Sequence, residues 1–115
     1  TSNHLIVEGA GGLMVPLNNQ ELMVDLIEQL QIPVILVSRN YLGSINHTVL
    51  SIEALERRKI PISGIVINGE PNPVTETFLA SYCQIPILFK VEHFSEITRE
   101  TIAHFVHRLD SKLFI

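Results

Sequence analysis

Short apolar runs that alternate with segments of helical periodicity are the feature that most constrains the fold of this sequence. The runs are rich in branched residues and predict strands at His4–Glu8, Val34–Val37, Ile62–Ile67 and Ile85–Phe89. Apolar residues spaced three or four apart predict helices at Glu21–Leu30, from an N-cap at Ser44 onward, at Val74–Tyr82 and at Glu96–Leu113. Strands and helices in this order predict an α/β fold, with a parallel sheet flanked by helices.

Length and composition narrow the class of protein. The chain has 115 residues, of which 46% are hydrophobic and 17% charged, and we expect a single domain over residues 1–115. No apolar run approaches the roughly 18–20 residues of a membrane span, so we expect no membrane partner. The net charge of −4 argues against nucleic acid, because Arg57–Lys59 is the only basic cluster. The single Cys83 suits a reducing compartment, which favours a cytoplasmic protein.

The first loop of interest is Glu8-Gly9-Ala10-Gly11-Gly12, because ligands of such sheets bind beyond the carboxyl ends of the strands. A carboxylate there suits a hard cation such as Mg²⁺, and the small residues let a phosphate approach the backbone N–H groups. The alternative is a tight turn in which Glu8 forms an ordinary ion pair. The loop is not a dinucleotide fingerprint, because the G-x-G-x-x-G spacing is absent.

Two further loops follow predicted strands. Gly43, Ser44 and Asn46 stand where a helix begins, and unsatisfied N–H groups there attract an anion such as a small carboxylate. The alternative is that Ser44 only caps the helix. Asn68-Gly69 ends another strand, and the donor and acceptor of an asparagine side chain can bind the edge of a purine. Asn-Gly is also a common turn dipeptide, so this pair alone leaves both interpretations open.

Known catalytic signatures are missing from the sequence. The phosphate-binding pattern G-x-x-x-x-G-K-[ST] does not occur, and Lys59, Lys90 and Lys112 all lie outside glycine-rich loops. No Ser/His/Asp or Cys/His triad can be assembled either. The sequence patterns on their own therefore identify no catalytic residue.

Taken together, the three loops resemble dethiobiotin synthetase. The stretches that carry the resemblance are VEGAGGLMVPL at Val7–Leu17, PVILVSRNYLGSINHTVLSIEAL at Pro33–Leu55 and ISGIVING at Ile62–Gly69. Cobyric acid synthases, and a domain attached to some phosphate acetyltransferases, are less similar in the second loop. The resemblance covers about residues 4–90 and implies a partial P-loop NTPase-like fold.

The resemblance implies a place in biotin biosynthesis, with ATP and Mg²⁺ used to join CO₂ to 7,8-diaminononanoate and close the ring of dethiobiotin. Members of that family act as homodimers. Their phosphate loop and catalytic lysine precede the matching region, and this chain starts without Met and enters a strand almost at once. We therefore expect a C-terminal part of a longer synthetase, inactive alone. The alternative is a non-catalytic regulatory module, such as the domain attached to acetyltransferases.

The resemblance also assigns roles to individual residues. It implies that Glu8 binds Mg²⁺ and lies with Gly9, Ala10 and Gly11 beside the nucleotide. The substrate carboxylate is assigned to Gly43, Ser44, Ile45 and Asn46, across the homodimer interface, and adenine to Asn68 and Gly69. By position alone, the rest of the nucleotide site falls on Glu92, His93 and Phe94. The ribose carboxylate stays open between Glu96 and Glu100.

Overall fold

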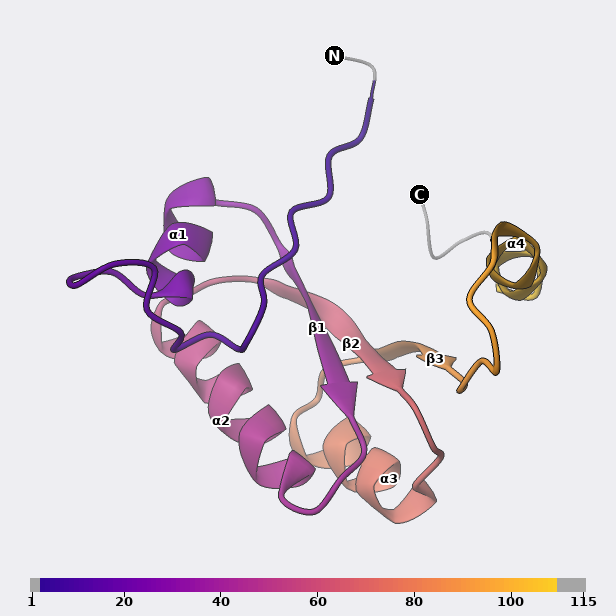
Figure 1. Ribbon diagram of the computed structural model, residues 1–115. Coiled ribbons are helices and arrows are strands. Elements are labelled where there is room, and N and C mark those ends of the chain that lie inside the picture. Colours follow the sequence, from indigo (N-terminus) through magenta and orange to yellow (C-terminus); the bar gives the residue numbers. More distant parts are fainter. Residues whose placement is uncertain (1–2, 110–115) are drawn as a thin grey trace.

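A computed structural model describes residues 3–109 as seven elements in an alternating order. They are α1 (Met23–Leu30), β1 (Val34–Arg39), α2 (Ser44–Arg57), β2 (Ile62–Asn68), α3 (Pro73–Tyr82), β3 (Ile87–Val91) and α4 (Arg99–His107). The strands form a parallel sheet in the order β1-β2-β3 (Figure 1). The predicted α/β fold, a parallel sheet with flanking helices, is confirmed.

The register of the sheet aligns the three strand ends. β1 pairs with β2 up to Arg39↔Asn68, and β2 pairs with β3 up to Asn68↔Val91. The carboxyl ends of all three strands therefore meet at one edge of the sheet, where ligands of parallel sheets bind.

One face of the sheet carries the main core. Ile65 and Ile67 of β2 are buried against Ile52 of α2 and Leu79 of α3. Residues two apart in a strand point to the same face, so α2 and α3 cover the same side of the sheet (Figure 1). Leu55, the next apolar residue of the α2 stripe, is buried in a second cluster with Val24, Ile60 and their neighbours, which joins α1 to α2.

The opposite face of the sheet is covered only in part. Phe105 of α4 packs there against Phe89 of β3, with ring centroids 6.4 Å apart. On the same face, Ile35 and Val37 of β1 remain 54% and 63% exposed. Figure 1 shows α4 set apart from the layer formed by α2 and α3.

The predicted strand His4–Glu8 is wrong. This segment is an exposed extended chain, and it pairs with no strand among residues 3–109 (Figure 1). An apolar run predicts strand character, but a strand forms only where a neighbouring edge takes up its backbone hydrogen bonds. Leu5, Ile6 and Val7 are consequently exposed.

Element boundaries differ from the prediction by a few residues, for local reasons. α1 begins at Met23 because a bridge between Pro16 and Leu22 holds the preceding residues in a turn. β3 begins after Pro86, whose ring nitrogen has no hydrogen to donate. The predicted C-terminal helix is present as α4, and its extension to Leu113 lies outside the described residues. None of the helices within residues 3–109 has the length and apolar character needed to cross a membrane.

Candidate functional site

Asn68 stands at the centre of the aligned strand ends. It lies between Arg39 and Val91, and its side chain is exposed without a hydrogen bond to any residue within 3–109. The next residue, Gly69, has φ +103°, a conformation that favours glycine. Its N–H donates to the carbonyl of Val91 at 2.8 Å. The side chain of Asn68 is therefore available to a ligand, whereas the N–H of Gly69 is already used.

A buried carboxylate lies behind this edge. Glu76, in the first turn of α3, is 4% exposed and accepts hydrogen bonds from Asn72 N at 3.0 Å and Asn40 Nδ2 at 3.4 Å. Lys90 of β3 forms an ion pair with it. The ammonium of Lys90, followed by the Asn72 N–H, lowers the pKa of Glu76, so the carboxylate is charged at neutral pH.

A groove of about 280 Å³ opens beside β3, between the loop after β2 and α4. Its walls are formed by Ile67, Gly69, Pro71, Glu76, Lys90, Glu92, Phe105 and Arg108. It is partly apolar and partly charged, which suits a ligand that has a planar apolar body and polar edges.

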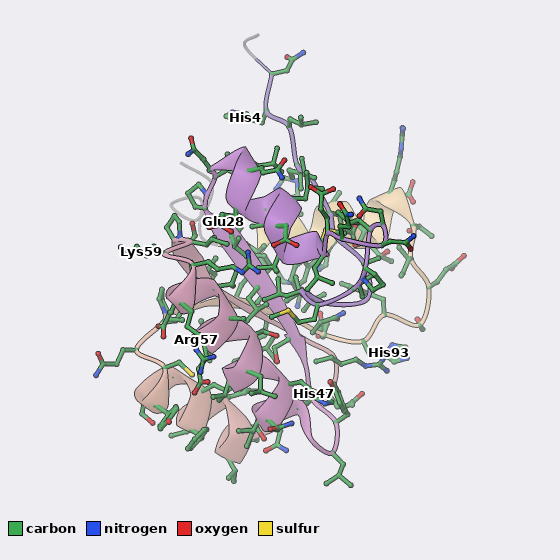
Figure 2. The ribbon with its side chains drawn as sticks, turned by 90° about the vertical axis from the view of Figure 1, so that its left-hand side faces the viewer. His4, Glu28, His47, Arg57, Lys59 and His93 are labelled. Atoms are coloured by element: carbon green, nitrogen blue, oxygen red, sulfur yellow. The ribbon has the colours of Figure 1, made fainter. Side chains whose placement is uncertain are left out.

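The groove brings together some of the residues that the sequence assigned to a nucleotide. Glu92 lines it together with Gly69, and Glu92 is held there by an ion pair with Arg108. Phe94 lines an adjoining hollow that also contains Glu92, and its ring meets that of Phe105 edge-on at 5.6 Å. His93 is exposed and lines neither hollow (Figure 2).

The start of α2 offers a different kind of site. Gly43, with φ +93°, is the N-cap, so the predicted capping role of Ser44 is wrong. Ser44 is the first helical residue and is 4% exposed, and its N–H donates to the carbonyl of Tyr41 at 3.0 Å. The N–H groups of Ile45 and Asn46 have no backbone partner within residues 3–109. These two donors at a helix N-terminus can bind an anion.

His47 lies beside this helix start and is paired with Tyr41. The hydroxyl of Tyr41 lies 2.6 Å from its Nδ1, and the two rings are 5.7 Å apart. Figure 2 shows His47 at the N-terminal end of α2, with Arg57 and Lys59 at the other end. The basic residues thus lie near the helix C-terminus, where cations complement the helix dipole.

The glycine-rich loop packs against the start of α1. A side chain at Gly9 would come within 3.1 Å of the sulfur of Met23, and Gly11, with φ +84°, lies against Val15. No hydrogen bond or ion pair within residues 3–109 joins residues 8–11 to the starts of α2 and α3. The structure thus aligns the ends of β1 and β2 and, within residues 3–109, joins the first loop to neither of them by a hydrogen bond or an ion pair.

Whether the loop at Glu8 can bind a metal ion depends on the ligating side chains near it. Glu8 is exposed and forms no ion pair within residues 3–109, so its oxygens can serve as ligands of a hard cation. The described residues contain no group of three or more His, Cys, Asp or Glu side chains placed to hold a metal. Glu8 therefore fits as one ligand of Mg²⁺, and the part of the chain described here does not form a complete site.

Comparison with known proteins assigns the chain to a family. The model of the AAA domain family matches residues 1–101. The chain belongs to this AAA domain family. A match of this extent covers all three strands of the sheet and agrees with the P-loop NTPase-like character expected from the sequence.

The chain is also similar to proteins named ATP-dependent dethiobiotin synthetase, and the predicted resemblance is confirmed. The identity is 42% over 103 residues with the protein of Paramagnetospirillum magneticum, covering 90% of this chain and 50% of that protein. It is 44% over 107 residues for Cytophaga hutchinsonii, covering 93% and 52%. For Christiangramia forsetii it is 46% over 113 residues, covering 95% and 54%. The chain thus spans about half the length of the curated relatives it matches.

Sequence reasoning missed the polar cluster behind Asn68. Four residues of the site were not predicted. Asn40 and Lys90 both bind the carboxylate of Glu76, and Arg108 lines the groove. The sequence signal available was Asn72-Pro73, a pattern typical of a helix start. No short sequence pattern indicates that residues so distant in the sequence come together in the fold.

Proposed function

We propose that this chain forms part of the nucleotide and substrate site of an ATP- and Mg²⁺-dependent dethiobiotin synthetase. The observation that carries the proposal is the 42–46% identity, over nine-tenths of the chain or more, with proteins that bear this name. The proposed reaction joins CO₂ to 7,8-diaminononanoate and closes the ureido ring at the expense of ATP.

In this proposal the nucleotide base is bound at the aligned strand ends. The exposed amide of Asn68 hydrogen-bonds the edge of adenine, and the groove bounded by Gly69 and Glu92 takes up the rest of the nucleoside. His93 and Phe94 follow Glu92 and line the outer part of that site. The support is that Asn68 has an unused amide next to a groove with both apolar and polar walls.

The substrate carboxylate is proposed to bind at the start of α2. The N–H groups of Ile45 and Asn46 are free to donate, and Gly43 leaves room for close approach. Ser44 forms the buried floor of this site and contributes no free N–H. The second wall comes from a second copy of the chain, since Leu42 at this end is fully exposed.

Glu8 is proposed to be a ligand of Mg²⁺, with Gly9, Ala10 and Gly11 beside the phosphates. Mg²⁺ would neutralise charge that develops on the phosphates, and Glu8 would orient it through a carboxylate oxygen. The catalytic lysine and the phosphate loop are proposed to lie in the half of the relatives' length that this chain does not cover. The chain alone is therefore proposed to be inactive.

The test is an assay of the intact protein that contains this chain. Phosphate release should require ATP, Mg²⁺, bicarbonate and 7,8-diaminononanoate together, and mass spectrometry should detect dethiobiotin. Asn68→Ala should raise the KM for ATP roughly ten-fold through loss of a hydrogen bond to the base. Ser63→Ala, at an exposed position of the same strand, is the matched control. Absence of dethiobiotin from the intact protein would overturn the proposal.

A further inference from the structure

We infer that Glu76, in the wall of the groove, is a positioning residue, which sets nucleobase selectivity by fixing the loop that follows Asn68. This inference rests on the proposed nucleotide site. The observation behind it is that segments from all three strand ends converge on one buried carboxylate.

The convergence involves one contact from each strand region. Asn40 follows β1 and donates to Glu76 at 3.4 Å, Asn72 lies in the loop after β2 and donates through its N–H at 3.0 Å, and Lys90 belongs to β3. Because the side chain of Glu76 is only 5% exposed, water competes little for these bonds. One carboxylate thus connects the loop after β1, the loop after β2 and strand β3, all beside the proposed base site.

The loop from Asn68 to Asn72 is held at three successive points. Gly69 N donates to Val91 O at 2.8 Å, Asn40 Nδ2 donates to the carbonyl of Glu70 at 2.9 Å, and Asn72 N donates to Glu76. Two of these three anchors depend on Glu76, since Asn40 is itself oriented by that carboxylate. Loss of Glu76 would leave the loop held at Gly69 alone and would leave the amide of Asn68 chemically unchanged.

Selectivity is the property most sensitive to such a loss. Adenine and guanine differ in the donors and acceptors of their edges, so a fixed Asn68 amide discriminates between them and a mobile one does not. A merely destabilised protein would contain fewer active molecules, but each of them would keep its preference. The ratio of ATP to GTP use therefore separates positioning from simple stability.

The experiment compares Glu76→Gln with Glu70→Gln in the intact protein, measuring kcat/KM for ATP and for GTP. Glu70 carries the same charge in the same loop, and its side chain is exposed, so the control removes a carboxylate outside the cluster. Glu76→Gln should lower the ATP to GTP ratio roughly ten-fold through the KM for ATP, with kcat little changed. Glu70→Gln should leave the ratio unchanged.

Asn40→Ala gives a second test that does not depend on the folding of E76Q. It removes the anchor of Glu70 O from the β1 side, so the ATP to GTP ratio should fall in the same direction. An unchanged ratio in both Glu76→Gln and Asn40→Ala would overturn the inference but leave the proposed function standing. A parent protein that makes dethiobiotin with no base preference would also overturn it. A parent protein that neither binds ATP nor makes dethiobiotin would overturn both the inference about Glu76 and the proposed function.

Discussion

At the scale of single residues, Gly64 is where the sheet tolerates no side chain. A methyl group built on it would lie 2.5 Å from Leu88 Cγ and 2.9 Å from the carbonyl oxygen of Pro86. The second contact is with backbone, which cannot turn aside. Gly64→Ala should therefore lower the free energy of unfolding by about 1–3 kcal/mol, measured by urea denaturation. Ser63→Ala, at the adjacent exposed position, should change it by less than about 0.5 kcal/mol.

The charge of Glu76 predicts a dependence of stability on pH. Its pKa is lowered in the folded protein, chiefly by Lys90, so the folded state binds a proton less readily than the unfolded state. The stabilisation is therefore complete above the ordinary pKa of a glutamate and is lost as the pH falls through the lowered value. Urea midpoints should fall between about pH 6 and about pH 3. Because Asp25 also has a lowered pKa, part of this fall should persist in Glu76→Gln, and a fall of equal size would contradict the role of Glu76.

The candidate site shows what single residues reveal in a sequence. Asn68 and Glu8 could be singled out because each follows an apolar run, and ligands of parallel sheets bind where strands end. Which groups are free to bind could not be predicted. Ser44 is polar in sequence yet buried in the fold, and the partners of Glu76 come from positions 36 residues before it, at Asn40, and 14 after it, at Lys90.

At the scale of elements, α3 begins with a side-chain cap whose loss can be measured. Asn72 Oδ1 accepts the N–H of Thr75 at 3.1 Å, and Pro73 occupies the first turn, where its missing N–H costs nothing. Asn72→Ala should lower the free energy of unfolding by about 0.5–2 kcal/mol. Asn72→Asp keeps an acceptor oxygen and should retain most of the stability. Equal losses in both variants would show that the cap contributes little.

Helices were predicted better than strands, for a physical reason. The stripe of α2 repeats every three or four residues, and Ile52 and Leu55 are buried as that spacing requires. A strand depends on a partner far along the chain, so the apolar run at His4–Glu8 predicted an element that has no neighbour among residues 3–109. The observed boundary of β3 differs from the predicted one because Pro86, just before the strand, has no N–H to donate.

At the scale of the whole molecule, the two faces of the sheet differ in how well they are covered. α2 and α3 bury Ile65 and Ile67 on one face, whereas on the other face the described residues include α4, which packs near β3, and no helix over β1. Ile35 and Val37 of β1 are exposed there, and among residues 3–109 no strand pairs with the outer edge of β1. An apolar surface that adjoins a free strand edge favours self-association.

The 115-residue chain alone should therefore associate with itself through the exposed face of β1. Val37→Lys places a charge at the centre of that face and should shift the sedimentation profile of the isolated chain toward the monomer at a given concentration. Val37 is 63% exposed, so the lysine can reach water and the fold should be retained, as circular dichroism would show.

Thr77→Lys adds the same charge at an exposed position of α3 and should leave association unchanged. If Val37→Lys and Thr77→Lys dissociate the oligomer to the same extent, net charge rather than the β1 face controls association. A wild-type chain that stays monomeric at high concentration would show that the uncovered face is tolerated in water.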